Sequence, residues 1–327
     1  DGRKPGKRPR KELAPSCASL YSPVDYRQEN SLLNVGERTN ASGSRKFKRL
    51  LEEENYDEMI SLARGMVREG SHLIDVNVDY AGRDNEADMS EIVSRIVRQV
   101  NVPLMLDSTQ PSIIEAGLKR APGKCVINSA NLEEGEEKFA EFCRLAKTYN
   151  AGLVLGCIDE DPDEAMARTA ERKLAIASRM FQLAVNTYRL PPEELFVDPL
   201  VLPVSTGMDK DRRSALETIE GTRLIAERFP QIQITCGLSN VSFGLKPAAR
   251  VVLNSAFLHE LEEAGLTSAI LHVSKIVPKA RVPEEQWQAA LDLIYNRPPK
   301  EPRELVDGSK SSDPLQLFID FFHDVEA

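Results

Sequence analysis

The stretch PLMLDSTQPSIIEAGLKRAPGKCVIN (residues 103–128) contains one complete copy of the pattern that decides the fold. Two short apolar runs flank a segment with helical periodicity, and that segment begins at Pro111, a residue type favoured in the first turn of a helix. Apolar runs of this length, without polar alternation, are typical of strands buried on both faces of a parallel sheet. The stretch therefore predicts a strand, a crossover helix and a second parallel strand.

The same unit recurs along the chain. The apolar runs are LLNVG (32–36), HLIDVNV (72–78), PLMLD (103–107), KCVIN (124–128), GLVLGC (152–157), LFVDP (195–199), QITCG (233–237) and SAILHV (268–273). The segments between them are amphipathic, and they predict helices that include FKRLLEEENYDEMISLARGMVREG (47–70), EIVSRIVRQV (91–100) with Ser90 as its N-cap, and roughly 135–148, 163–188, 211–228, 248–264 and 283–295. Eight strand–helix repeats favour a (β/α)₈ TIM barrel over a doubly wound sheet.

Composition excludes several function classes. The 327 residues carry a net charge of −9, which argues against a general nucleic-acid binder, because such proteins need a basic face. No run of about 18 apolar residues is present, so we expect no contact with a membrane. Five cysteines without a CxxC pair predict reduced core residues of a cytoplasmic protein, and four scattered histidines predict that this chain binds no metal.

The two ends of the chain differ from the repeats. Residues 1–11 contain six basic residues among prolines and glycines, so we expect a flexible linker there and a surface course for residues 12–30. Residues 298–314 are rich in proline, glycine and serine and predict another linker, followed by a short apolar helix. We expect the chain to be a piece of a longer protein, with a barrel over residues 31–297 between N-terminal (1–30) and C-terminal (298–327) connecting segments.

Polar residues gather where the predicted strands end, which is the face that carries the active site in such barrels. They are Glu37, Thr39, Asn40, Asp75, Asn77, Asp79, Asp107, Ser108, Asn128, Asp159, Asp198, Ser239, Asn240, His272 and Ser274. The absence of a Lys/Arg cluster disfavours a phosphate substrate, and the absence of closely spaced His and carboxylate residues disfavours a metal-activated water. Carboxylates and amides suit a neutral heterocycle that offers both N–H donors and carbonyl acceptors.

Five motifs carry a family resemblance: NVGERTN (34–40), LMLDST (104–109), GLKRAPGKCVINS (117–129), VDPL (197–200) and GLSNVSFG (237–244). In this order they resemble the folate-binding module of cobalamin-dependent methionine synthases over residues 31–297. The resemblance implies a pterin-binding, dihydropteroate synthase-like (β/α)₈ barrel that binds 5-methyltetrahydrofolate. It also implies a methyltransferase that gives the N5 methyl group to cob(I)alamin carried by another module, which yields methylcobalamin and tetrahydrofolate.

The resemblance also implies roles for the site residues. Asp107, Asn128 and Asp198 match positions that hold the pterin ring, and Asn240 matches an asparagine that hydrogen-bonds N5. Asp75 matches an acidic position below the pterin, and we expect it to share a proton network with Asn240. The remaining members of the expected binding site are Glu37, Thr39, Asn40, Asn77 and, as a shaping neighbour, Ser239. The partners implied are a preceding homocysteine module and a following cobalamin module of the same parent chain.

Three alternatives stay open at this point. The motifs also match methyltetrahydrofolate:corrinoid iron–sulfur protein methyltransferases, and a non-catalytic folate-binding module would carry the same residues. A dihydropteroate synthase is disfavoured because the Arg-x-His that it places at strand eight is missing from ILHVS (270–274). His272 departs from the methionine synthase pattern, and it is either a polar contact to folate or a histidine of the barrel rim.

Overall fold

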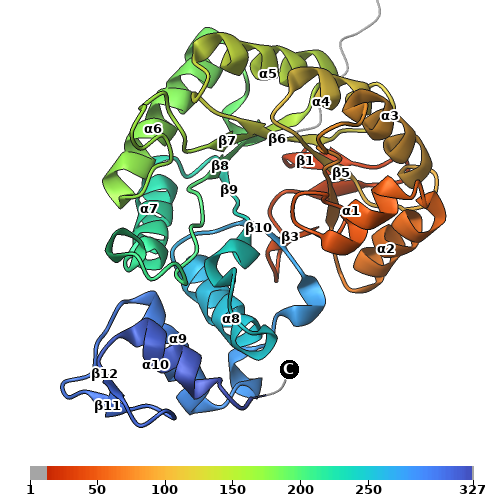
Figure 1. Ribbon diagram of the computed structural model, residues 1–327. Coiled ribbons are helices and arrows are strands. Elements are labelled where there is room, and N and C mark those ends of the chain that lie inside the picture. The colour runs from red at the N-terminus through yellow and green to blue at the C-terminus, as the bar shows by residue number, and fades with distance from the viewer. Residues whose placement is uncertain (1–12, 326–327) are drawn as a thin grey trace, which may run out of the picture.

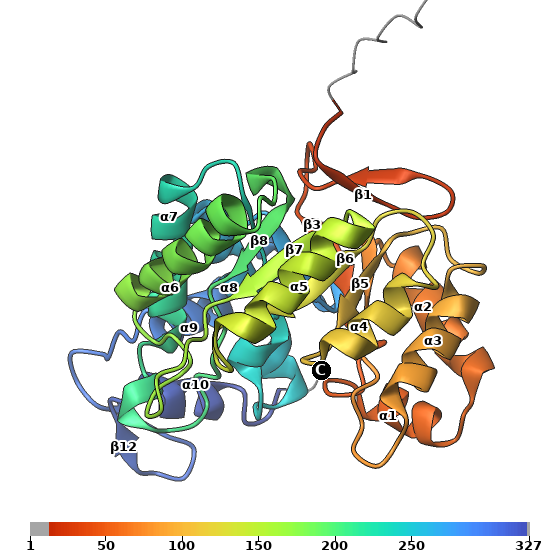
Figure 2. The same cartoon turned by 90° about the horizontal axis from the view of Figure 1, so that it is seen from above.

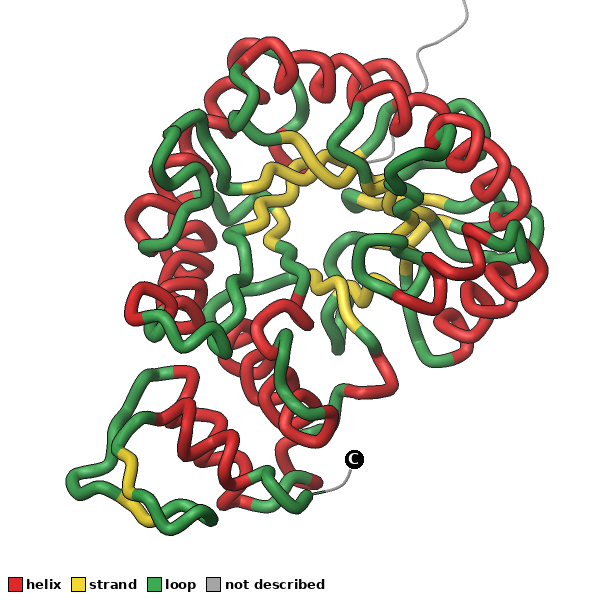
Figure 3. Tube along the Cα trace, viewed as in Figure 1, coloured by secondary structure: helices red, strands yellow, loops and turns green. Residues whose placement is uncertain are grey.

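Eight parallel strands form the centre of the computed structural model, which describes residues 13–325. The order β10-β3-β4-β5-β6-β7-β8-β9 closes into a barrel, because a parallel bridge joins Gly237 to Ile270 and the Ile270 N–H donates to the Cys236 carbonyl oxygen at 2.8 Å. Figure 3 shows the strands as an inner ring with helices around it. All eight predicted strands and the TIM barrel are confirmed: β3 (Leu33–Gly36), β4 (Leu73–Val76), β5 (Leu104–Asp107), β6 (Val126–Ala130), β7 (Gly152–Gly156), β8 (Leu195–Asp198), β9 (Gln233–Ile234) and β10 (Ser268–Leu271).

The helices cover the outside of the barrel (Figure 1). They are α1 (Arg45–Glu52), α2 (Tyr56–Arg68), α3 (Asn85–Ile96), α4 (Pro111–Leu118), α5 (Glu136–Tyr149), α6 (Ala170–Gln182), α7 (Ser214–Arg228), α8 (Pro247–Glu263) and α9 (Glu284–Ile294).

Two helix predictions need correction. Ser90 is not an N-cap, because α3 starts earlier and the Asp84 side chain accepts a hydrogen bond from the Ala87 N–H at 3.1 Å. The single helix predicted over residues 47–70 is two helices in the structure. Asn55 is the N-cap of the second one, which begins at Tyr56.

An antiparallel hairpin closes the amino-terminal mouth of the barrel. Its strands are β1 (Ser16–Ala18) and β2 (Pro23–Asp25), and Figure 2 shows it at one end of the strands. Cys17 and Tyr26 are fully buried against apolar side chains that point inward from six barrel strands. The course of residues 13–30 thus differs from the surface path that their mixed composition predicted, since the hairpin completes the core of the barrel floor.

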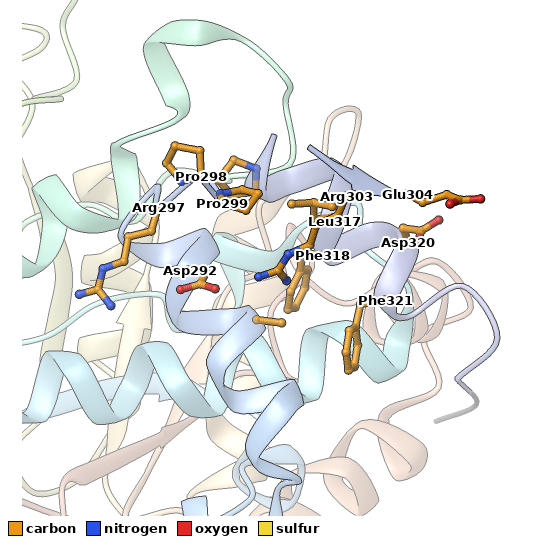
Figure 4. A pocket seen from close by; sticks show the side chains of 12 residues that line it. Asp292, Arg297, Pro298, Pro299, Arg303, Glu304, Leu317, Phe318, Asp320 and Phe321 are labelled. Atoms are coloured by element: carbon orange, nitrogen blue, oxygen red, sulfur yellow. The ribbon is translucent and has the colours of Figure 1, made fainter. Parts of the chain in front are cut away.

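The C-terminal residues form a small attachment beside α9. A short hairpin of β11 (Arg303–Glu304) and β12 (Lys310–Ser311) precedes the predicted apolar helix, α10 (Pro314–Phe321), which packs against α9. A cavity of about 280 Å³ lies here, and Figure 4 shows its lining residues from the 292–304 and 317–321 segments. Within residues 13–325 no helix is long and apolar enough to cross a membrane.

Candidate active site

The centre of the candidate site is one asparagine between two acids. Asn40 follows β3, Asp75 lies in β4 and Asp107 ends β5, so three neighbouring strands bring them together. Asn40 Nδ2 donates to Asp75 Oδ2 at 2.7 Å and to Asp107 Oδ2 at 2.8 Å. The Asn40 Oδ1 atom accepts from the backbone N–H groups of Ser42 (2.9 Å) and Gly43 (3.0 Å), which fixes which end of the amide faces the acids.

These two acids lie where a charge is costly. Asp75 is fully buried, and its Oδ1 atom has no hydrogen-bond partner among the described residues. Burial raises the pKa of Asp75 well above its ordinary value, and the nearby carboxylates of Asp107 and Glu37 raise it further. Burial also raises the pKa of Asp107, with Asp79 and Asp198 adding to the effect. Two such neighbours titrate as a pair, so the site can hold a proton near neutral pH.

A second layer of hydrogen bonds supports the pair. The Asn77 Oδ1 atom accepts from the Asp79 N–H at 3.0 Å, and the Ser108 hydroxyl donates to the Asp79 carboxylate at 2.9 Å. The Thr39 hydroxyl donates to the Asp75 carbonyl oxygen. Asp79 and Ser108, which were noted only as strand-end residues, therefore join the loop after β4 to the end of β5, beside the two acids.

Asn128 and Asp198 occupy the next strand ends around the barrel. Asn128 in β6 is in register with Asp107, and its carbonyl oxygen accepts from the Ser108 N–H at 3.0 Å. Asp198 ends β8 and accepts from the Leu200 N–H at 2.7 Å. Burial raises the pKa of Asp198 to about 6, although the Leu200 hydrogen bond and the Lys173 cation both act to lower it.

Lys173 is the residue near the site that the sequence analysis missed. It lies in α6 and is fully buried, with its ammonium group close enough to act on Asp198. The signal was in the helix itself: Lys173 shares one face with the buried residues Ala177 and Met180. A lysine on the apolar face of an amphipathic helix is unusual, because lysine is almost never fully buried without partners.

Asn240 and Ser239 follow β9 in the short 3₁₀ helix Leu238–Ser242. Asn240 is exposed at the carboxyl end of the barrel. The Ser239 hydroxyl donates to Glu37 Oε1 at 3.1 Å, which joins the loop after β9 to the loop after β3. Burial raises the pKa of Glu37, while the Ser239 hydrogen bond and the Arg250 charge lower it.

His272 has its polar contacts at the rim. Its Nδ1 atom lies 3.2 Å from the Ser274 hydroxyl and 3.9 Å from Glu69 Oε2, and Glu69 also pairs with Arg38 at 2.7 Å. Burial lowers the pKa of His272, and the positive charge of Arg38 lowers it further. This arrangement is that of a rim histidine in a cluster of charged groups.

The arrangement suits one class of ligand. Every residue expected in the site lies at the carboxyl end of a strand, with buried carboxylates and amides from several strands and a spare buried oxygen on Asp75. A planar molecule with adjacent N–H donors and carbonyl acceptors could pair with such groups. Among residues 13–325, no group of three or more His, Cys, Asp or Glu side chains could hold a metal ion.

Known proteins resemble this chain at two levels. Methionine synthase of Mycobacterium tuberculosis (strain ATCC 25618 / H37Rv) is 43% identical over 326 residues, which cover 98% of this chain and 26% of that protein. Methionine synthase of Mycobacterium leprae (strain TN) is 41% identical over 316 residues, 96% of this chain and 25% of that protein. The chain thus spans about a quarter of the length of these curated relatives.

Solved structures share the fold at low identity. A dihydropteroate synthase from Xanthomonas albilineans in complex with 7,8-dihydropteroate superposes with a TM-score of 0.54 at 13% identity, covering 81% of this chain and 92% of that one. The dihydropteroate synthase from Thermus thermophilus gives a TM-score of 0.56 at 17% identity, covering 80% of this chain and 95% of that one. The family described as pterin binding enzyme matches residues 36–272, which hold seven of the barrel strands complete and all the residues of the candidate site. The chain therefore belongs to the pterin binding enzyme family, with methionine synthases among its relatives.

Proposed function

We propose that this chain binds 5-methyltetrahydrofolate and transfers its N5 methyl group to cob(I)alamin carried by another module. The observation that carries the proposal is the hydrogen-bonded Asp75–Asn40–Asp107 group, with Asp75 fully buried, at the strand ends of a pterin-binding barrel. The resemblance to methionine synthases supports the choice of methyl donor and acceptor. The reaction is the folate half of methionine synthesis.

The pterin ring is held by Asp107, Asn128 and Asp198 in this proposal. An ionised carboxylate accepts two adjacent N–H groups, and an amide gives one donor and one acceptor, which matches the edge of a neutral pterin. Asn40 positions Asp107 through its hydrogen bond, and the Leu200 N–H positions Asp198. Glu37, Thr39, Asn77 and Ser239 complete the proposed binding site around these groups. Binding therefore rests on groups that the protein already holds in place.

Methyl transfer breaks the N5–C bond of the folate, and the methyl group leaves without the bonding electrons. Those electrons stay on N5, so the leaving group needs a proton or a strong hydrogen bond. Asn240 supplies the hydrogen bond, which strengthens as N5 gains electron density. The Asp75–Asp107 pair can hold a proton near the pterin, because the pKa values of both carboxyl groups are raised. Cob(I)alamin, when present, supplies the electron pair that forms the bond to the methyl carbon.

The parent protein in this proposal is a cytoplasmic enzyme of several modules. Residues 31–297 form the barrel of its folate module, residues 1–30, whose hairpin packs on that barrel, lead to it from a homocysteine module, and residues 298–327 lead to the cobalamin module. The length of the relatives supports such an arrangement, because they are about four times as long as this chain. Five buried, unpaired cysteines are consistent with a reducing compartment.

The test is to mix the chain anaerobically with 5-methyltetrahydrofolate and cob(I)alamin and to follow the absorbance spectrum. We expect the cob(I)alamin bands to give way to those of methylcobalamin at a rate that saturates with folate. Asp107→Ala should lose folate binding. Asp159→Asn should behave like the unchanged chain, because Asp159 follows β7 but its carboxylate is bound to Arg172 at 2.7 Å.

Two results would contradict the proposal. Folate binding without any change in the cobalamin spectrum would favour a non-catalytic binding module. Transfer to a corrinoid iron–sulfur protein but not to cobalamin would favour the related methyltransferase.

A further inference from the structure

A buried lysine lies behind the candidate site, in the wall of the barrel. The Lys173 ammonium group donates to the carbonyl oxygens of Ala167 (2.8 Å), Pro199 and Leu200 (3.2 Å). An ammonium group has three protons, so these three oxygens can use all of them. Two of the three acceptors belong to the residues that directly follow Asp198.

Leu200, whose carbonyl oxygen accepts from the lysine, has an unusual backbone conformation. Its φ angle is +65°, in the left-handed region that residues with a branched side chain rarely adopt. Its carbonyl oxygen accepts hydrogen bonds from both Lys173 and the Thr218 hydroxyl (2.9 Å), and its N–H donates to Asp198 Oδ1 at 2.7 Å. A strained residue persists only when its surroundings fix it, and here the two donors do so.

The neighbouring helix is shaped to admit the lysine. Gly221 lies in α7, and a Cβ atom placed there would be 2.6 Å from Lys173 Cδ, well inside van der Waals contact. The helical glycine has no positive φ to explain it, and glycine in a helix interior is destabilising relative to alanine. The space beside Gly221 is therefore occupied by the lysine stem.

We propose that Lys173 is a positioning residue whose ammonium group holds Leu200 in its left-handed conformation and so fixes the Asp198 carboxylate for the pterin. The inference rests on the proposed function only in naming the ligand. The geometry behind it is a chain of hydrogen bonds from α6 through the backbone of residues 199–200 to the end of β8.

The charges around Asp198 support this role. Lys173 approaches it from α6, Cys157 and Cys236 follow the flanking strands β7 and β9, and Asp107 ends β5. Burial raises the pKa of both thiols far above neutral pH, so they carry no charge, whereas Asp107 disfavours a second anion nearby. Burial lowers the pKa of Lys173 to about 8, so the amine is still an ammonium group in the pH range where Asp198 titrates. Glu217 favours the ammonium form and Arg168 disfavours it. Lys173 thus gives Asp198 a positive neighbour on the side of α6.

The first experiment uses the ligand-free chain. Lys173→Met keeps an unbranched stem beside Gly221 and removes the charge and the donors. We expect the Asp198 carboxyl carbon, observed by NMR and assigned with Asp198→Asn, to titrate at a higher pH in Lys173→Met than in the unchanged chain. Arg172→Met is the matched control, because Arg172 neighbours Lys173 in α6 but pairs with Asp159. It should leave the titration where it was.

The second experiment measures the dissociation constant of 5-methyltetrahydrofolate. Lys173→Met should weaken binding roughly tenfold, as loss of a buried charged hydrogen-bond donor does. Leu200→Gly removes the cost of the positive φ, so Lys173→Met should weaken binding less in the Leu200→Gly background. Thr218→Val removes the other donor to Leu200 without changing the shape of the side chain. It should also weaken binding, and it replaces Lys173→Met as the test if Lys173→Met does not fold.

The outcomes separate the two proposals. Failure of the unchanged chain to bind 5-methyltetrahydrofolate would overturn the proposed function, while the NMR titration would still test the lysine. A folded Lys173→Met chain with an unchanged Asp198 titration and unchanged folate affinity would overturn the positioning role. An equal loss of affinity with and without Leu200→Gly would overturn the part played by the left-handed conformation.

Discussion

Asn40 shows at the scale of one residue how this site is built. Its amide makes four hydrogen bonds, two to backbone N–H groups and two to carboxylates from different strands. The sequence predicted that Asn40, Asp75 and Asp107 would share the same end of the barrel, because all three follow apolar runs. It could not predict the shared amide group, since that contact depends on the closeness of three strands in the folded chain.

Asn240 allows a prediction that separates catalysis from binding. Asn240→Ala should slow methyl transfer far more than it weakens folate binding, because its hydrogen bond to N5 strengthens only as the methyl group leaves. Loss of one such donor costs about 10²- to 10³-fold in rate in other enzymes. Single-turnover rates and equilibrium binding of 5-methyltetrahydrofolate give the two numbers. Equal losses in the rate of methyl transfer and in folate affinity would show that Asn240 only binds the folate.

Asp198 predicts a pH dependence whose sign follows from its raised pKa. As the pH falls through about 6 the carboxylate takes up a proton and can no longer accept two N–H groups, so folate binding should weaken. The folded chain takes up this proton at a higher pH than the unfolded chain, where the pKa is 3.8, so this residue makes the free energy of unfolding rise as the pH falls from about 6 towards 4.

Asp198→Asn should remove both contributions while keeping an oxygen for the Leu200 N–H. The measurements are dissociation constants between pH 5 and 8 and urea unfolding at pH 5 and 7, each on both chains. The slope that remains in the variant comes from the other groups with shifted pKa values, which include Asp75, Asp107, Glu37 and His272. Identical pH profiles for the two chains would show that Asp198 stays ionised throughout.

At the scale of elements, the sequence predicted the strands and helices that repeat along the chain and missed the ones that occur once. The eight strands were visible as apolar runs and most helices as 3.6-residue periods. The hairpin of β1 and β2 was not, because two strands of three residues give no repeating pattern and their burial depends on the barrel that they close. Lys173 was missed for a related reason: the pattern marked its helix face as buried, but only the backbone of residues 199–200 explains a charge there.

Tyr26 tests whether that hairpin is part of the barrel. Its ring packs edge-on against Phe196 with 4.8 Å between centroids, and its hydroxyl donates to Glu194 at 2.8 Å. Tyr26→Ala should lower the free energy of unfolding by about 3–5 kcal/mol through the cavity that it leaves. Tyr26→Phe should cost about 1 kcal/mol, since Glu194 keeps its ion pair with Lys124.

The control for this pair lies in the same hairpin. Tyr21 is exposed in the turn, so Tyr21→Ala should change the free energy of unfolding by less than about 0.5 kcal/mol. Urea unfolding followed by circular dichroism gives all three values. A Tyr26→Ala chain as stable as the unchanged one would mean that the barrel floor does not depend on the hairpin.

At the scale of the whole molecule, the barrel divides into an apolar floor and a polar top. Nine side chains fill the floor without an ionisable carboxylate among them, while the opposite ends of the same strands gather the acids. Burying those acids opposes folding, so the rest of the molecule must stabilise the site. We therefore expect ligand binding, which relieves this cost, to be coupled to the stability of the entire barrel.

The five cysteines can measure that coupling, because they are spread from Cys17 in the hairpin to Cys236 beyond β9 and all are buried. Burial raises the pKa of Cys17, Cys125, Cys143 and Cys157 to about 12, and that of Cys236 well above its ordinary value, so no reactive thiolate is available in the folded chain. A thiol reagent at pH 8 should modify none of them quickly and all five in denaturant.

Slow labelling of the folded chain then reports how the molecule opens. With the reagent dilute enough for opening to stay at equilibrium, 5-methyltetrahydrofolate at a hundred times its dissociation constant should slow labelling by global unfolding about 100-fold. If the hairpin opens only with the barrel, Cys17 and Cys236 should slow by the same factor, as mass spectrometry of labelled peptides can show. Fast labelling of Cys17 that folate does not slow would instead mark residues 13–30 as a separately opening segment, and would place the edge of the cooperative barrel near residue 31.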